Sequence, residues 1–232
     1  MFRLAPLLLL LACASVGSVQ TANTVGRGNL QISAEPGAQV LGGKPGLQLY
    51  PHLDVAVRYG FTDRLDLGLR AGWSFLEAQS KYQLTSPGST RLAISFAPNV
   101  GGVILTSNSV SVDPLGGILS AATPFLFGIG IGAHQLVLGL RSQHFIFIGG
   151  PSTRPMYMLA VGGSLGFALR FSDALTLLPE LAAVWPVWGG LPVTYSGDGV
   201  HADYLYGAVG TGIFQFKLGF LLDRKTSFSK PK

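Results

Sequence analysis

The chain has 232 residues and a net charge of +5, with 48% hydrophobic residues, 32 glycines and only 12% charged residues. Soluble domains carry about 25% charged residues, so this composition argues against a surface that faces water everywhere. Residues 222–232 hold four cations against one anion, and Arg3 precedes the first apolar run, which leaves residues 13–222 with a charge of +1. So small an excess argues against a nucleic-acid-binding protein, because phosphate binding requires clustered Lys and Arg.

The N-terminus is expected to be a lipoprotein signal peptide covering residues 1–12. Arg3 precedes an apolar run, and Leu10-Leu11-Ala12-Cys13 has the pattern of a lipobox. Cleavage there would make Cys13 an acylated N-terminus carrying diacylglyceryl and palmitate chains, which hold a protein stably at about 0.8 kcal/mol per buried methylene. Residues 13–27 would then be a lipidated linker. No other cysteine remains for a disulfide, a metal site or a nucleophile.

From Gly28 onward the sequence repeats apolar, Gly-rich segments separated by short turns. About ten segments are expected to be strands, near residues 28–38, 49–59, 65–74, 77–85, 90–104, 116–128, 135–148, 157–170, 175–187 and 203–221. Each approaches the roughly 9–11 residues that a tilted strand needs to cross an outer membrane. We predict an all-β fold, an antiparallel up-and-down transmembrane β-barrel of about ten strands (about 8 to 12 possible) over residues 28–221, followed by a basic tail at 222–232.

Alternation of side-chain size predicts how these strands face. Large apolar residues alternate with small or charged ones in Leu53-Asp54-Val55-Ala56-Val57-Arg58 and Leu65-Asp66-Leu67-Gly68-Leu69-Arg70. In a soluble barrel the face opposite the bulky one would be strongly polar, whereas here it is mostly Gly, Ala and Ser. The bulky face is therefore expected to meet lipid and the small face a narrow lumen. Candidates for interfacial aromatic girdles are Tyr50, Tyr59, Trp73, Trp185 and Trp188.

Two hairpins carry a resemblance to a known group of proteins. One runs over Val57–Arg70 and contains Gly60-Phe61-Thr62-Asp63-Arg64, and the other begins with Gly163–Asp173. With them the chain resembles small, lipid-anchored outer-membrane β-barrel proteins of Gram-negative bacteria, over most of residues 25–221. The resemblance implies an outer-membrane location, contact with membrane lipid, and handling by the barrel-assembly and lipoprotein-export machineries. It implies no particular activity, because such barrels serve as pores, adhesins, enzymes and structural elements.

The alternation also predicts which charged side chains face the lumen. They are Asp54, Arg58, Asp66, Arg70, Lys81, Arg141, Arg170, Glu180 and Lys217. These charges could form a constriction that selects small anions. The interpretation we favour is a network of ion pairs that fills the interior, because about eight strands already leave little free bore. We therefore expect a structural or narrow-pore role without catalysis, cofactor or metal, and the sequence leaves the oligomeric state open.

Two other functions stay open at this point. One is a periplasm-facing, lipocalin-like barrel that carries a hydrophobic ligand between inward bulky residues. The other is a lipid-modifying enzyme using Ser142 and His144, although no orienting carboxylate lies nearby in the sequence. His52, His134 and His201 are isolated, which disfavours metal binding. Gly128, Gly130 and Gly132 lack the strand-turn-helix context of a phosphate-binding loop.

Overall fold

The computed structural model describes residues 16–41, 48–72, 75–88, 91–106, 115–148, 156–193, 203–206 and 212–225. They form the strands β1 (Asn29–Leu41), β2 (Gln48–Gly60), β3 (Leu65–Ala71), β4 (Phe75–Gln83), β5 (Leu92–Phe96), β6 (Asn99–Thr106), β7 (Leu115–Ala122), β8 (Phe125–Ile131), β9 (His134–Ile148), β10 (Met156–Arg170), β11 (Leu175–Val193), β12 (Asp203–Tyr206) and β13 (Ile213–Lys225). Within these ranges no helix is long and apolar enough to span a bilayer.

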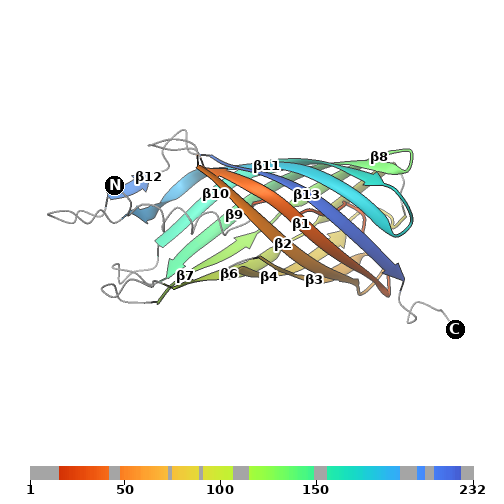
Figure 1. Ribbon diagram of the computed structural model, residues 1–232, viewed down its shortest axis with the longest axis horizontal. Coiled ribbons are helices and arrows are strands. Elements are labelled where there is room, and N and C mark those ends of the chain that lie inside the picture. The colour runs from red at the N-terminus through yellow and green to blue at the C-terminus, as the bar shows by residue number, and fades with distance from the viewer. Residues whose placement is uncertain are drawn as a thin grey trace.

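The strands close into an antiparallel barrel with ten strand positions (Figure 1). β1 pairs with β2 on one side and with β13 on the other, which joins the two ends of the chain. β5 and β6 share one position because both pair with β4, and β7 and β8 share the next because both pair with β9. The short β12 lies outside the barrel path and pairs only with β11. The all-β, antiparallel barrel of about ten strands is thus confirmed.

Prolines explain why two of the ten positions are each divided into two strands. Pro98 separates β5 from β6, and Pro124 separates β7 from β8. Proline has no N–H to donate to a neighbouring strand, so it interrupts the ladder. The two breaks lie side by side, since Ala97 N–H donates to Pro124 O at 2.8 Å. Each pair of short strands therefore still occupies a single strand position in the barrel wall.

The two rims of the barrel differ in their connections. Turns at 61–64, 132–133 and 171–174 lie at the end where β1 begins and β13 ends, which we call the short-turn rim. Thr62 Oγ1 accepts from Leu65 N–H at 3.0 Å and Ser172 Oγ from Leu175 N–H at 3.1 Å, so each hydroxyl stabilises its own turn. The predicted longer links at 41–48, 105–115, 149–156 and 188–202 fall largely outside the described residues. The strand ends that flank them lie at the opposite end of the barrel, which we call the long-loop rim after these predicted links.

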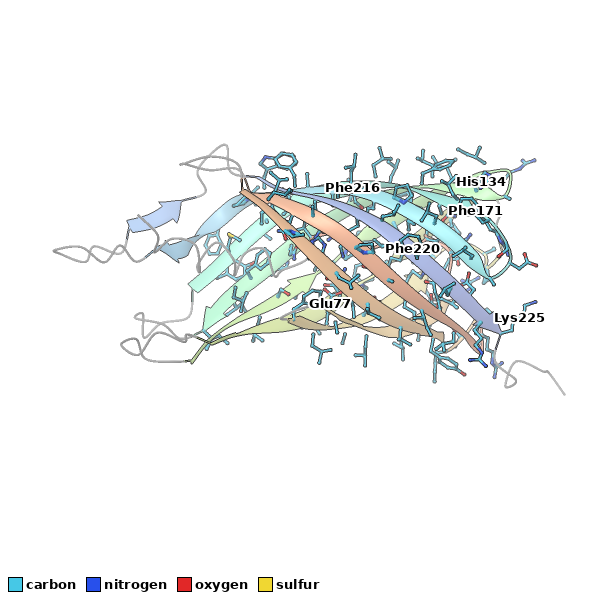
Figure 2. All side chains as sticks on the ribbon, viewed as in Figure 1. Glu77, His134, Phe171, Phe216, Phe220 and Lys225 are labelled. Carbon is cyan, nitrogen blue, oxygen red and sulfur yellow. The ribbon has the colours of Figure 1, made fainter. Side chains whose placement is uncertain are left out.

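The wall is apolar outside and polar inside. Leu53, Leu69 and Leu140 are 56%, 59% and 61% exposed, and Figure 2 shows Phe216 and Phe220 on the outer side of β13. Their strand neighbours, among them Asp54, Arg70 and Lys217, are buried. This is the reverse of the inward bulky face that a lipocalin-like carrier needs.

Two boundaries differ from those expected. Residues 16–25 lie inside the barrel rather than forming a linker, as described below. β13 continues to Lys225, so Asp223, Arg224 and Lys225 belong to the last strand and not to a tail. The reason is strand pairing, because β1 supplies partners for β13 as far as Asn29, which faces Lys225.

Candidate functional site: the lumen

Ten charged side chains are buried inside the described part of the barrel, five cationic and five anionic. They are Arg58, Arg70, Lys81, Arg141 and Lys217, with Glu35, Asp54, Asp66, Glu77 and Glu180. The interior charges therefore balance, which does not favour a constriction selective for anions. Eight of the nine residues predicted to face the lumen are in this set. Glu35 and Glu77 were not predicted.

Glu35 is the centre of the largest ion cluster. Its carboxylate lies 3.0 Å from Lys217 Nζ, 3.5 Å from the Arg58 guanidinium and 3.8 Å from the Arg70 guanidinium. Ser33 donates a further hydrogen bond to it at 2.8 Å. The side chain is fully buried, so its charge is compensated by neighbours from three strands instead of by water. Such a carboxylate joins β1, β2, β3 and β13 from the inside.

Two further ion pairs lie directly across β3 and β4. Arg70 faces Glu77 and Asp66 faces Lys81 in the strand register. The Arg70–Glu77 distance is 2.8 Å and the Lys81–Asp66 distance is 3.2 Å. Opposite charges at facing positions stabilise a strand pair. Burial makes each partner costly to remove, because the other charge would be left in a poorly solvated interior.

Arg170 is the exception among the predicted lumen residues. It is the last residue of β10, and its side chain is 51% exposed and bonded to Asp173 in the adjoining turn at 2.9 Å. The alternation points it inward, but at this position the lumen ends and the solvated rim begins. The prediction that Arg170 belongs to the lumen network is therefore wrong.

The N-terminal residues described by the structure run through the lumen. We call residues 16–25 the lumen segment. Val16, Gly17, Ser18, Val19 and Gln20 are all buried, although no strand of the barrel includes them. The chain reaches β1 at the short-turn rim, where Gly28 N–H donates to Gly60 O at 2.7 Å. Gly26 and Gly28 have φ of 85° and 75° there, a conformation that glycine adopts without strain.

The wall binds the backbone of the lumen segment from several strands. Its amide N–H groups donate to wall side chains: Gly17 to Gln215, Ser18 to Glu180, Ala22 to Gln135, Thr24 to Gln83 and Val25 to Asp66. Its carbonyl oxygens accept from other side chains: Gly17 from Arg70, Thr21 and Asn23 from Lys81, and Ala22 from Ser95. Charged side chains of the ion pairs thus also satisfy buried peptide groups, which would otherwise be costly.

Asp54 also pairs with Lys217, and Ser18 connects the last two buried charges, Arg141 and Glu180. Arg141 donates to Ser18 Oγ at 3.1 Å, and Glu180 accepts from Ser18 N–H at 3.4 Å. Glu180 faces Lys217 of the Glu35 cluster in the register of β11 and β13, whereas Arg141 lies on β9, two strand positions from β11. The lumen segment therefore links β9 to the side of the interior that holds the Glu35 cluster.

Two small apolar pockets receive side chains of the lumen segment. Val19 packs with Ala168, Leu178 and Leu221, all at most 4% exposed. Ala22 packs with Ala93, Ala97 and Leu126, all at most 2% exposed. Next to the segment, a cavity of about 10 Å³ lies between Ser18, Gln20 and the wall, near the lower limit for a single water molecule. This part of the lumen is filled by side chains and by the segment.

Ser142 and His144 do not form a catalytic pair with each other. Ser142 Oγ lies 2.7 Å from Thr123 Oγ1, and His144 Nδ1 lies 2.5 Å from Tyr157 Oη. Each therefore contacts a neighbouring part of the wall: Ser142 contacts the residues between β7 and β8, and His144 contacts β10. No acid–base partner joins them among the contacts of the described residues, so their geometry does not support hydrolysis.

The other singled-out histidines and glycines have structural positions. His52 lies beside Gln215 of the wall at 3.0 Å, and His134 Nδ1 accepts from Arg170 N–H at 3.2 Å at the short-turn rim. Gly128 and Gly130 belong to β8, and Gly132 forms the two-residue turn to β9 with a φ of 62°. His201 and Cys13 lie outside the described residues.

Of the comparisons with known proteins, the one with solved structures finds outer-membrane proteins. No protein-family model matches the sequence, and no curated protein matches it. Among solved structures, the chain is similar to the outer membrane protease OmpT of Escherichia coli, with 8% identity and a TM-score of 0.44, covering 91% of this chain and all of that one. It is also similar to the COG4313 outer membrane channel of Pseudomonas putida F1 (10% identity, TM-score 0.41, coverage 90% and 100%). A third similar structure is the translocator domain of the autotransporter NalP from Neisseria meningitidis, with 11% identity and a TM-score of 0.39, covering 85% of this chain and 88% of that one. The pairing of β1 with both β2 and β13 establishes the closed barrel independently of these similarities.

Proposed function

We propose that this chain is an outer-membrane β-barrel lipoprotein with a structural role, whose lumen is closed by ion pairs and by the lumen segment. The observation that carries the proposal is the inverted polarity of the wall. Apolar side chains cover the outside, and a balanced set of ten buried charges lies inside. A closed barrel of this kind satisfies every backbone group of a membrane-spanning sheet without an exposed edge.

The aromatic side chains support a bilayer position. Tyr59 and Phe61 are exposed near the short-turn rim, and Trp185 and Trp188 are exposed well along β11 toward the long-loop rim. Aromatic residues of transmembrane barrels concentrate at the two interfaces, about 25 Å apart. Ten residues separate Leu175, where β11 begins, from Trp185, which corresponds to about 25 Å for a strand tilted by about 40°.

The filled lumen favours a structural role over a narrow pore. An open pore requires a continuous path of water between the rims. Here the segment's peptide groups and the wall's charges hydrogen-bond to one another across the bore. A conducting state would require the lumen segment to move.

Acylation of Cys13 remains part of the proposal, and it has a geometric consequence. Val16 is the third residue after Cys13, a span of at most about 11 Å. Gly17 lies at the height of Gln215, to which it is hydrogen-bonded. Gln215 precedes Asp223, at the short-turn end of β13, by eight residues. The distance from Gly17 to the short-turn rim is therefore about 20 Å along the barrel axis. An acyl chain in the leaflet at the short-turn rim would therefore require residues 16–18 to leave their positions, whereas the contacts of Ala22, Thr24 and Val25 with the wall do not depend on those residues and would keep the lumen closed.

Four measurements test the proposed function, two for the closed barrel and two for the lipid. Purified wild-type protein in detergent should migrate differently on gels before and after heating, and it should give no steady conductance in planar bilayers. Metabolic labelling with palmitate and mass spectrometry of the mature N-terminus test the lipid, with Cys13→Ser as the control. A protein freely soluble without detergent would overturn the membrane assignment. An unlabelled mature chain would overturn only the lipoprotein part.

A further inference from the structure

We propose that the lumen is a binding site for an extended polypeptide of the pattern Gly-x-Val-x-x-Ala. The lumen segment occupies this site within the same molecule, and a second copy of its sequence can replace it. The inference deepens the proposed function and rests on it, because it identifies what the closed lumen binds. It is carried by the backbone contacts, the two apolar pockets and the charge balance of the wall.

The first observation is that the wall recognises main-chain groups. Acceptors on β3, β4, β9, β11 and β13 receive N–H groups of the segment, and Lys81, Arg70 and Ser95 donate to its carbonyl oxygens. Main-chain hydrogen bonds of this kind provide affinity for an extended peptide irrespective of most of its side chains. The site is therefore built for a polypeptide strand and not for a small solute.

The second observation is that pockets fix the register of the bound strand. A Cβ at Gly219 would overlap Cγ1 of Val19, and a Cβ at Gly128 would lie 2.7 Å from Cβ of Ala22. Both glycines thus leave room for a particular side chain of the segment. At Gly17, a Cβ would lie 2.9 Å from Oε1 at the flexible end of Gln215, so a larger residue there would displace that side chain and the hydrogen bond that it accepts from Gly17 N–H. These three positions define the pattern.

The third observation is that the segment carries no charge, so its departure would remove hydrogen bonds, among them those of Arg141 and Glu180 to Ser18, but would not change the balance of the ten buried charges. The ion pair of Lys81 with Asp66 and those of Arg70 with Glu77 and Glu35 join wall residues only, so they do not depend on the segment. Its departure would therefore leave these charges paired, and water could take over the hydrogen bonds that the segment makes. A plug that neutralised an unpaired buried charge would instead cost several kcal/mol to remove. The segment is therefore held as a ligand would be, by hydrogen bonds and apolar contacts that can be exchanged without breaking the ion pairs of the wall.

The junction with the barrel allows this exchange. Only residues 26–28 connect the lumen segment to β1, and two of them, Gly26 and Gly28, have positive φ. The anchoring contact from Gly28 to Gly60 lies at the rim, outside the segment. Release of residues 16–25 therefore leaves the strand order of the barrel unchanged.

The test uses full-length variants in planar bilayers. Val19→Asp places a charge in an apolar pocket and Gly219→Ala fills the pocket from the wall side. Both should conduct, with at least about tenfold more open time than wild type, the change that 1.4 kcal/mol produces in an equilibrium. Gly219→Ala combined with Val19→Gly should close again because the overlap is removed. Ala133→Asp, in the exposed turn between β8 and β9 and outside the segment and its junction, is the control and should stay closed.

A synthetic peptide with the sequence of residues 16–27 then tests binding directly. Added to the Val19→Asp barrel, it should block most of the conductance, whereas the same peptide carrying Val19→Asp should not. Heat-dependent gel mobility shows that each variant is folded. A folded Val19→Asp barrel that stays silent, or one that conducts and ignores the peptide, would overturn the inference and leave the closed barrel standing. Conductance of the wild type would instead overturn the proposed closed state.

Discussion

Lys81 Nζ lies 3.2 Å from Asp66 Oδ2, and each of the two side chains also holds the backbone of the lumen segment. Lys81 donates to Asn23 O at 2.7 Å, and Asp66 accepts from Val25 N–H at 3.0 Å. One buried ion pair thus joins β3 to β4 and the wall to the segment. Its removal should affect both barrel stability and the segment.

Lys81→Met and Asp66→Leu should each destabilise the folded barrel. Breaking a buried pair leaves the other charge uncompensated, at a cost of about 3–5 kcal/mol in the free energy of unfolding. Together the two substitutions remove both charges, so the double variant should lose clearly less than the sum of the single losses. Urea unfolding followed by tryptophan fluorescence measures all three. Additive losses would show that the pair is not coupled.

Glu35→Gln should be more damaging than Asp173→Asn. Glu35 is fully buried and faces three cations, so neutralising it leaves excess positive charge in the interior. Asp173 pairs with Arg170 in an exposed turn, where an ion pair contributes about 0–1 kcal/mol. The two variants can be compared by their midpoint temperatures of unfolding in the same detergent. Equal midpoints would contradict the assigned role of Glu35.

Leu140→Arg tests the outward face. Leu140 is 61% exposed on β9, and a cation on the lipid face of a barrel costs about 2–4 kcal/mol near the bilayer midplane. Ala133→Arg in the exposed turn between β8 and β9 is the matched control. The first variant should unfold at lower urea in lipid vesicles, and the second should match wild type. A tolerated Leu140→Arg would place this face outside the hydrocarbon.

Ser142→Ala and His144→Ala should leave membrane lipids unchanged. Ser142 is bonded to Thr123 and His144 to Tyr157, so neither has the geometry of a nucleophile with its base. Mass spectrometry of outer-membrane lipids from cells expressing each variant, compared with wild type and with the deletion strain, measures this. Loss of the same lipid product in both variants would revive the enzyme hypothesis.

Much of the wall could be read from the sequence because strand periodicity is local. Side chains of a strand point alternately to opposite faces, so Leu53 and Asp54 are assigned to opposite faces without knowledge of the partner strand. The turn at 61–64 is equally local, because Thr62 hydrogen-bonds its own backbone. Arg170 shows where the rule fails. Alternation gives the direction of a side chain but not the height at which the lumen ends.

Glu35 and Glu77 could in principle have been found by the same rule. Each occupies the inward parity of its strand, but neither stands within a clear alternation of bulky and small residues. Pro36 follows Glu35, and Trp73, Phe75 and Leu76 surround the start of β4 with large side chains of both parities. The pattern was too irregular there to assign a face.

The sequence by itself determined the barrel class with about ten strand positions, the hairpin turns and the apolar exterior, since these follow from the two-residue period and from turn chemistry within a few residues. Only the tertiary structure decided which charges pair and what fills the bore. Lys217 meets Glu35 across 182 positions, and Gly17 meets Gln215 across 198. No local preference encodes such contacts, because closure of the barrel brings these groups together. The small residues of the lumen segment acquire their role only when that closed wall surrounds them.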